Sequence, residues 1–352
     1  MKISYKIRDK VIEPNLVLSP MAGVTDSIFR RLIKHQGGVG LVVTEFLSIE
    51  GMTRGGANCR TRQMMKFWPE EHPIAIQIFG SDPERMAMAA QMVEEEGADF
   101  VDINCGCPAR KVVGHGGGSS LLRNPGLLEE ILRKTVKAVS IPVTLKIRAG
   151  WDSNSINCVE IAKLAEDCGV EAIALHGRTR VQAYTGWADW DLVKAIKDAV
   201  KIPVSGSGDI RDVETALKRF QETGCDSIHI GRGAMYNPWL FRQVAAVMRG
   251  EEPYKPTLED KRQLLLHFIE LMLEAMPTET AALGKVKQLC GQYTRGLPNG
   301  SHFREDIYHS HKSSEIVDHI NRYFDNLHAR GYERYEETPI DSAELEQMTC
   351  EA

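Results

Sequence analysis

The 352-residue sequence lacks long hydrophobic runs: no apolar stretch approaches the roughly 20 residues that a membrane-spanning helix needs. The first six residues, Met-Lys-Ile-Ser-Tyr-Lys, also lack the apolar segment of a secretory signal. Membrane and secreted classes are therefore disfavoured, and we expect a cytoplasmic protein with no membrane partner.

Metal-binding spacings are absent as well. None of the eight cysteines belongs to a Cys-x-x-Cys pair, and no His-x(3–5)-His segment accompanies them. Such spacings are typical of structural zinc sites. We therefore expect no metal, and we expect most of the thiols to be small buried side chains in a reducing compartment.

The sequence also lacks a net positive charge, since the formal total is −5. Residues 333–352 hold seven acids against one base, so residues 1–332 carry a net charge of +1. The acidic end is typical of a solvated tail. Basic surface for a nucleic acid therefore has to be local, as in residues 51–69, with four bases and no acid, and residues 285–312, with five Lys or Arg against two acids.

One unit is present many times: a short apolar, often β-branched run alternates with an amphipathic stretch of helical period. The pattern predicts an α/β fold, a (β/α)8 TIM barrel of about 245 residues. An open, doubly wound sheet is the alternative, but no Gly-x-Gly-x-x-Gly follows the first run. The eight predicted strands are residues 16–19, 39–46, 74–79, 100–104, 143–148, 172–176, 203–205 and 227–230.

The pattern changes after Gly250. Residues 251–256 read as a linker, and residues 258–274, 281–295 and 313–330 have helical period with no strand between them. We predict a barrel over residues 1–250, a small all-helical domain over 257–332 and an acidic tail over 333–352.

Polar residues follow nearly every predicted strand, whereas the strand interiors are Val, Ile and Leu. In a TIM barrel the active site lies at the carboxyl ends of the strands, so these residues are expected to meet. In chain order the residues at the strand ends are Pro20, Met21, Ala22, Gly23, Glu45, Gln77, Asn104, Cys107, Lys146, Arg148, His176, Arg178, Ser207, Gly208, Asp209, Gly231 and Arg232.

The last two of these strand ends resemble phosphate sites. Glycine-rich turns at 206–210 and 231–234 each precede a predicted helix, and backbone N–H groups at such a turn bind anions. Two tight turns with a solvated Arg232 are the alternative. Because both turns follow the strands expected for a phosphate site, the pattern favours a phosphate-bearing cofactor.

For other side chains at the strand ends, the sequence allows two or more functional interpretations. Lys146 and Arg148 point to the same face of one strand, which indicates a ligand-facing pair rather than edge residues. Gln77 is either a contact for a heterocycle edge or a satisfied core amide. Cys107 is a nucleophile, an inert thiol or a proton donor with basic neighbours, and composition alone does not choose among these.

Taken together, the strand ends resemble the flavin-dependent tRNA-dihydrouridine synthases, in particular their second bacterial type. The element around Asn-x-Gly-Cys-Pro is the most specific part, and the helical region is similar to the tRNA-recognition domain of that family through Tyr293-x-x-Gly-x-Pro298 and Arg304. The matching segments are residues 19–26, 77–80, 102–108, 146–152, 176–180, 206–210 and 231–234.

The resemblance implies a role for each strand end. FMN would lie near Pro20, Met21 and Ala22, with Gln77, Lys146 and His176 as further contacts. Its phosphate would bind at Ser207, Gly208, Asp209, Gly231 and Arg232. NADPH would reduce the flavin, hydride would pass from N5 to C6 of a uracil, and Cys107 would protonate C5. Asn104, Arg148 and Arg178 would contact the substrate, a uridine flipped out of tRNA.

Two departures from the family pattern accompany this resemblance. Ser207 stands where the family usually has Asn, and Cys105 precedes the Gly-Cys-Pro element. Two other functions are alternatives: an FMN barrel acting on a free pyrimidine, like dihydroorotate dehydrogenase, and a non-enzymatic tRNA-binding protein. The helical domain argues against the first, because a small substrate needs no such module. The uridine position, the choice of NADPH or NADH and the oligomeric state are left open, a monomer being compatible with the sequence.

Overall fold

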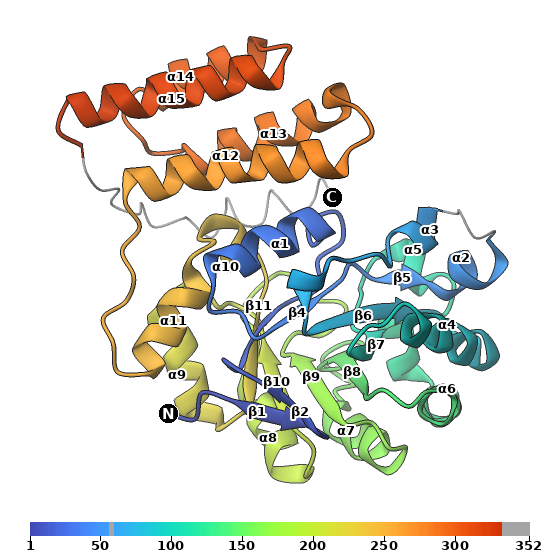
Figure 1. The fold of residues 1–352 in the computed structure, drawn as a ribbon. Helices are drawn as coiled ribbons and strands as arrows, with labels where there is room; N and C mark the ends of the chain where they lie inside the picture. Colours follow the sequence, from blue (N-terminus) through green and yellow to red (C-terminus); the bar gives the residue numbers. More distant parts are fainter. Residues whose placement is uncertain (56–59, 333–352) are drawn as a thin grey trace. The chain divides into compact units, whose positions relative to one another are not determined.

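The structure, a computed structural model, describes residues 1–55 and 60–332 (Figure 1). The chain divides into two compact units, the first made of Met1–Met235 with Leu240–Pro253 and the second of Tyr236–Trp239 with the chain from Tyr254 onward. The acidic tail predicted over 333–352 lies outside the described residues.

The first unit contains a closed barrel of eight parallel strands, which confirms the predicted fold (Figure 1). The barrel closes because β4 pairs with β6 and β11 pairs with β3. All eight predicted strands are present, four of them with the predicted bounds. The strands are β3 (Leu16–Leu18), β4 (Leu41–Val43), β6 (Ile74–Phe79), β7 (Phe100–Cys105), β8 (Val143–Arg148), β9 (Ala172–His176), β10 (Val204–Ser207) and β11 (Ser227–Ile230).

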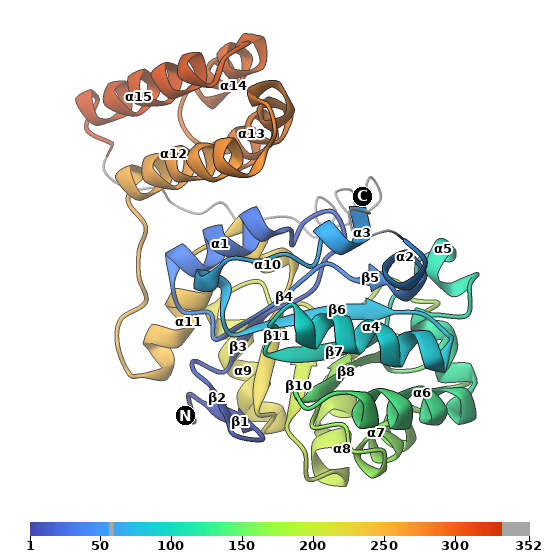
Figure 2. The same ribbon diagram turned by 45° about the vertical axis from the view of Figure 1, so that its right-hand side comes forward.

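Helices surround these strands (Figure 2). Several begin at a side-chain cap of the kind that favours helix initiation, such as Asp82 before α4 and Asn124 before α6. Their apolar faces pack with the strands into one large core. The longer helices are α1 (Ser27–Gln36), α4 (Pro83–Glu95), α6 (Pro125–Ala138), α7 (Cys158–Asp167), α8 (Asp191–Ala199), α9 (Val213–Thr223) and α11 (Leu240–Met248). Shorter ones are α2 (Ile49–Arg54), α3 (Arg60–Gln63), α5 (Arg110–Val113), α10 (Arg232–Tyr236), η1 (Pro69–Glu71) and η2 (Gly118–Arg123).

One predicted strand is shorter than its apolar run. The sequence predicts a single strand over residues 39–46, but β4 ends at Val43 and a separate two-residue strand, β5 (Leu47–Ser48), follows. The reason is that the side chains of Thr44 and Glu45, which lie between β4 and β5, form hydrogen bonds with backbone elsewhere in the barrel. The Thr44 hydroxyl accepts the backbone N–H of Gln77 at 3.1 Å, and the Glu45 carboxylate accepts the N–H of Gly23.

The amino-terminal end of the barrel is closed by a hairpin that the sequence pattern does not predict. It consists of β1 (Tyr5–Ile7) and β2 (Lys10–Ile12), which pair antiparallel. Its apolar residues pack against the inward side chains of the barrel strands, among them Val17 and Phe100. The end of the barrel that remains open to a ligand is therefore the one at the carboxyl ends of the strands.

The described residues of the second unit form four helices: α12 (Leu258–Ala275), α13 (Glu279–Tyr293), α14 (Gly300–His309) and α15 (Ser313–Ala329). The sequence predicts three of them. The helix that it misses is α14, which buries only Phe303 and Ile307 among its apolar side chains and so has a weak apolar stripe. No helix in the described part of the chain is long and apolar enough to cross a membrane.

Candidate active site

The loop that carries Cys107 is held in place by three side chains. The Asn104 side-chain oxygen accepts the N–H groups of Gly106 at 3.0 Å and Cys107 at 2.9 Å. Arg148 Nε donates to the Gly106 carbonyl at 2.8 Å, and the Ser119 hydroxyl donates to the Cys107 carbonyl at 3.0 Å. The loop therefore has a fixed backbone before any ligand binds.

A glycine is needed next to this loop. Gly118 has φ +57°, and a Cβ there would lie 2.8 Å from the Cys107 carbonyl oxygen. A side chain at Gly118 would displace the loop. The sequence motif Gly116-Gly117-Gly118 thus has a structural reason at its last position.

The Cys107 thiol is only 9% exposed. Burial raises its pKa, and a hydrogen bond from the Ala109 backbone and the charge of Arg148 oppose that shift only in part. A thiol with a raised pKa is protonated at neutral pH. Of the three chemistries open at the sequence level, a group that gives up a proton matches this state better than a thiolate nucleophile does.

A buried chain of hydrogen bonds leads from the barrel interior to the loop. Asn104 Nδ2 donates to Gln77 Oε1 at 2.7 Å, and Gln77 Nε2 donates to Asp102 Oδ2 at 2.6 Å. Thr144 Oγ1 donates to the other oxygen of Asp102 at 2.6 Å. Burial raises the pKa of Asp102, while the bonds from Thr144 and Gln77 oppose the shift. Gln77, predicted as a contact for a heterocycle, is fully buried and already bonded on both its oxygen and its nitrogen.

Lys146 differs from these groups, because its ammonium has no hydrogen-bond or ion-pair partner among the described residues. It lies beside Asn104 in the register of β7 and β8. Burial lowers its pKa to about 8, and the charge of Asp102 only partly opposes this. A partly buried cation without a partner is unfavourable, so the site is suited to an electron-rich or anionic ligand at this point.

His176 lies between β8 and β10, opposite Arg148 on one side and Ser207 on the other. Burial and the charges of Arg148 and Lys146 hold its pKa well below the usual value, so the imidazole is neutral at neutral pH. Its Nε2 accepts from Arg178 Nη1 at 3.3 Å. The remaining ring nitrogen, Nδ1, is then the protonated one and is a donor.

Arg178 is buried and its guanidinium is already engaged. Nη2 forms an ion pair with Asp209 Oδ1 at 3.0 Å and donates to the Gly186 carbonyl, and Nε donates to the Thr185 carbonyl at 3.1 Å. The other Asp209 oxygen accepts the N–H of Ala188 at 2.8 Å. Arg178 and Asp209 together bind the loop that follows β9.

Arg148 binds the same loop. Its Nη1 donates to the carbonyls of Thr179 at 2.9 Å and Ala183 at 2.7 Å. Only 2% of the residue is exposed. Both arginines predicted to contact the substrate are therefore engaged with backbone of the protein itself, which favours a structural part for them at the site.

The ends of β10 and β11 form a cradle of backbone N–H groups. Gly208 (φ +121°) and Asp209 (φ +57°) have left-handed backbone, and a Cβ at Gly208 would lie 2.5 Å from the Cβ of Ala188. The N–H groups of Gly208, Asp209, Gly231 and Arg232 have no acceptor among the residues that the structure describes. Such a group of free donors is an anion-binding arrangement.

The loop after β3 reaches this cradle. The sulfur of Met21 lies 3.4 Å from the position of a Cβ on Gly231. The Thr25 hydroxyl accepts the Met21 N–H at 3.0 Å and fixes the turn that contains Pro20 and Ala22. The structure thus brings the residues predicted at the ends of β3, β10 and β11 to one edge of the barrel.

Sequence reasoning missed several residues of this site: Thr25, Asp102, Ser119 and Thr144. The signal for Asp102 and Thr144 was available, because each is a polar residue two positions before a predicted site residue, Asn104 or Lys146, and the two are neighbours in the β7–β8 register. No group of three or more His, Cys, Asp or Glu side chains able to hold a metal ion occurs in residues 1–55 and 60–332.

Polar groups held at the carboxyl end of a TIM barrel, with an anion cradle at the last two strands, define an enzyme site of the phosphate-binding barrel class. Residues 17–328 match the family described as Dihydrouridine synthase (Dus). The chain belongs to this family of enzymes.

Curated relatives of this chain carry names of the same family. The chain is 44% identical over 294 residues to a protein of Pseudomonas aeruginosa named tRNA-dihydrouridine synthase B, covering 83% of this chain and 87% of that one. It is 40% identical over 324 residues to a protein of the same name from Vibrio parahaemolyticus, covering 92% and 99%. A probable tRNA-dihydrouridine synthase of Rickettsia conorii is 40% identical over 304 residues, covering 85% and 90%.

Among solved structures, a 2-naphthoyl-CoA reductase complex aligns with a TM-score of 0.55 at 16% identity, covering 71% of this chain and 52% of that chain. At this identity the likeness concerns the fold alone.

Proposed function

We propose that this protein reduces a uridine of tRNA to 5,6-dihydrouridine, with FMN as cofactor and NADPH as electron donor. The observation that carries the proposal is a protonated, positioned Cys107 at the same end of the barrel as a partnerless Lys146 and a set of free backbone donors. The family and the names of the curated relatives support the choice of substrate and product.

The residues present fit FMN. The free N–H groups of Gly208, Asp209, Gly231 and Arg232 would hold its phosphate, together with the guanidinium of Arg232. Burial lowers the pKa of Arg232, and the neighbouring Arg178 adds to that shift, so an added dianion would relieve repulsion between these cations. Ser207 offers a hydroxyl where the family usually has an amide, and the backbone cradle does not depend on that side chain.

The ring of the cofactor would lie over Pro20, Met21 and Ala22, with the Lys146 ammonium and the His176 Nδ1–H as donors to its polar edge. Gln77 is fully buried and bonded to both Asn104 and Asp102, so we assign it a positioning part rather than a direct contact with the cofactor. When bound, reduced FMN supplies the hydride that C6 of the uracil accepts.

Cys107 supplies the proton. The thiol holds it at neutral pH, and the proton passes from Sγ to C5 of the uracil as C6 gains the hydride, so one C=C bond becomes a C–C bond with two new C–H bonds. The charge of Arg148 favours the thiolate that is left behind. Solvent then returns a proton to the sulfur before the next turnover.

We assign Asn104, Arg148 and Arg178 a different part from the one that the resemblance implies. Asn104 uses its side-chain oxygen for the Cys107 loop and one amide hydrogen for Gln77. The two arginines bind backbone carbonyls. We propose that all three position the loops around the substrate, and that Asn104 has one remaining N–H for the uracil.

The helical unit would bind the tRNA. A protein with this function is expected in the cytoplasm. An FMN barrel for a free pyrimidine is the second candidate among enzymes, and the four helices after Tyr254 argue against it because a small substrate does not need them. A non-enzymatic tRNA-binding protein would need none of the buried site described above.

The proposal is tested by mapping dihydrouridine in tRNA from cells with and without this protein. Loss of the modified base at one or more positions, restored by the intact gene, is expected. Unchanged dihydrouridine at every position would contradict the proposal. A yellow purified protein whose flavin absorbance is bleached by NADPH is expected in parallel, and a colourless protein that binds no flavin on addition of FMN would contradict the cofactor.

A further inference from the structure

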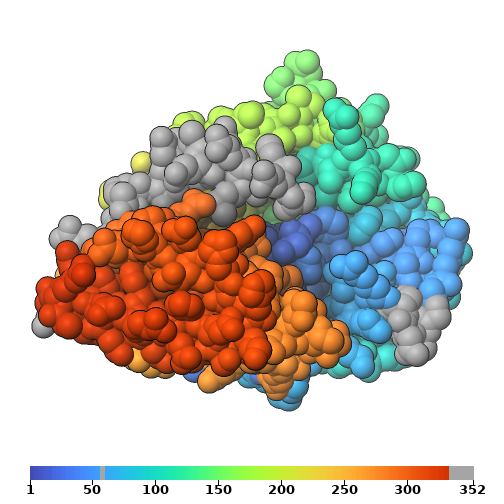
Figure 3. Space-filling model, turned by 90° about the horizontal axis from the view of Figure 1, so that it is seen from above, coloured from blue at the N-terminus to red at the C-terminus, as the bar shows by residue number. Residues whose placement is uncertain are grey.

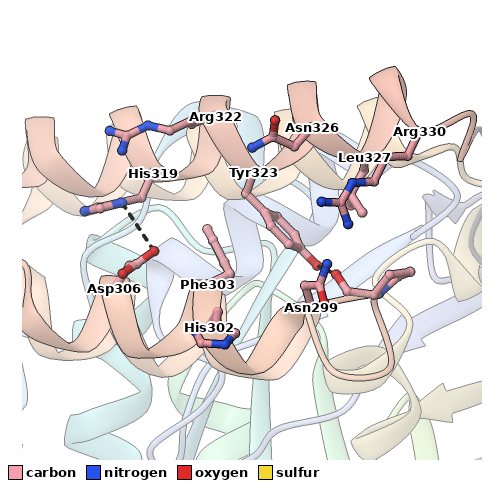
Figure 4. Close-up of a pocket in the computed structure, with 11 residues that line it drawn as sticks. Asn299, His302, Phe303, Asp306, His319, Arg322, Tyr323, Asn326, Leu327 and Arg330 are labelled. Atoms are coloured by element: carbon pink, nitrogen blue, oxygen red, sulfur yellow. Dashed lines mark hydrogen bonds and ion pairs between the residues drawn. The ribbon is translucent and has the colours of Figure 1, made fainter.

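The helical unit contains a pocket that the reaction does not use. It lies between α14 and α15 and has a volume of about 180 Å³ (Figure 4). Phe303 from α14 and Tyr323 from α15 form its aromatic part, stacked with ring centroids 4.4 Å apart and planes at 23°. The surface of these two helices is the red part of the space-filling view (Figure 3).

The aromatic ring of Tyr323 is fixed in place. Its hydroxyl donates to the carbonyl of Pro298 at 2.8 Å. Pro298 is the last residue of the Tyr293-x-x-Gly-x-Pro element that the sequence pattern singled out, so this element ends at the pocket. A rigid aromatic surface loses little conformational entropy when a planar group stacks on it.

The pocket carries unneutralised positive charge. The guanidinium groups of Arg322 and Arg330 have no hydrogen bond or ion pair with any side chain that the structure describes. Arg262 of the same unit, in contrast, binds Asp325 at 2.9 Å. The one carboxylate in the lining, Asp306, lies 3.9 Å from His319, on the side of Tyr323 away from Arg330 (Figure 4).

We propose that this pocket is a binding site for one unstacked nucleotide of tRNA. Aromatic rings stack on the bases of single-stranded RNA, and guanidinium groups bind phosphate oxygens. The carboxamides of Asn299 and Asn326 at the rim can each donate and accept, as recognition of a base edge requires. This inference rests on the proposed function for its partner, since tRNA is the polyanion on which the enzyme acts.

The spacing of the two arginines decides how they act. They stand eight positions apart on α15 and its end, which is about 12 Å along the helix. Figure 4 shows that the Arg322 side chain extends away from Tyr323, whereas the Arg330 guanidinium lies on the other side of the Tyr323 ring. The two guanidinium groups therefore bind different phosphates of one strand, with the nucleotide between them on Tyr323.

The experiment measures tRNA affinity of the full-length holoenzyme at several salt concentrations. The test variant is Arg322→Gln with Arg330→Gln. The matched control is Arg133→Gln with Lys218→Gln, which also removes two positive charges but at exposed helix positions of the barrel unit. Removing one side chain that binds a phosphate lowers the slope of log affinity against log salt by about one.

The expected result is a slope lowered by about two and an affinity lowered by about tenfold at low salt, in the test variant only. Circular dichroism, thermal midpoint and the rate of flavin reduction by NADPH should equal those of the wild type. The same slope and affinity in test and control variants would overturn the proposal. So would a raised KM for NADPH with unchanged tRNA binding, because the pocket would then serve the dinucleotide.

These outcomes are separable from those of the proposed function. If the wild-type protein bound tRNA but formed no dihydrouridine, the proposed reaction would be contradicted. The salt slopes of the test and control variants would still show whether the pocket binds tRNA. If the wild type bound no tRNA at all, the partner and the pocket would both be contradicted.

Discussion

The side-chain oxygen of Asn104, on strand β7, accepts the backbone N–H of Cys107, three residues further along the chain, at 2.9 Å. The same amide donates to Gln77, which donates to Asp102 inside the barrel. The position of the thiol is therefore set by the barrel core rather than by the substrate. This relationship makes Asn104 a positioning residue first and a substrate contact second.

Asn104→Ala should lower the rate of dihydrouridine formation by about 100-fold, because a small displacement of a reacting group has that effect. The rate of flavin reduction by NADPH should not change. If Asn104 mainly positions Cys107, the loss appears in kcat while KM for tRNA stays near the wild-type value. A variant with unchanged kcat and a strongly raised KM would show that Asn104 acts chiefly by binding uracil.

Arg178→Gln should destabilise the protein by about 2–3 kcal/mol, because it removes the shorter of the two ion pairs of the buried Asp209 carboxylate and leaves only Arg232, at 3.8 Å. Urea unfolding of the cofactor-free protein measures this directly. Arg133→Gln, which removes an exposed arginine that pairs with Glu129, is the control and should change stability by less than about 0.5 kcal/mol. Wild-type stability in Arg178→Gln would contradict the structural part assigned to this arginine.

Lys146 predicts a pH dependence of stability. Its pKa is about 8 in the folded protein and about 10.5 in the unfolded chain, so between these values the unfolded chain binds more protons. The free energy of unfolding of the cofactor-free protein should therefore gain about 1–3 kcal/mol from this group as the pH rises from 8 to 10.5.

Lys146→Met isolates this contribution from those of other groups that titrate in the same range. The variant should be more stable than the wild type at about pH 7, and the difference should shrink as the pH rises. A difference that stays constant from about pH 7 to about pH 10.5 would contradict the lowered pKa of Lys146.

Much of the barrel was predictable, because each strand is a short apolar run and each helix has an amphipathic period. The exceptions have local causes. The hairpin of Tyr5–Ile7 and Lys10–Ile12 is three residues per strand, too short for a periodic signal. The run at 39–46 ends early as a strand because Thr44 bonds to Gln77 on β6 and Glu45 bonds to the loop at Gly23.

The sequence predicts which residues meet at the candidate site better than it predicts what each of them does there. Strand ends meet at one edge of a barrel, so polar residues there could be grouped from sequence alone. Which atoms of Arg148 and Arg178 are free depends on the carbonyls of residues 179–186, and no strand pattern indicates the conformation of that loop. The same holds for Arg322 and Arg330, whose lack of partners among the described side chains is a property of the folded helices.

The most direct test of the account is a single-turnover measurement with Cys107→Ala. Enzyme whose flavin has been reduced by NADPH is mixed with tRNA that lacks dihydrouridine, and the product is measured by the mass gain of two hydrogens. Cys105→Ala, which removes the neighbouring buried thiol, is the control. We predict that Cys107→Ala retains flavin and its reduction by NADPH but forms little dihydrouridine, while Cys105→Ala forms the wild-type amount. Full product formation by Cys107→Ala would contradict the proton-donor role on which the account rests.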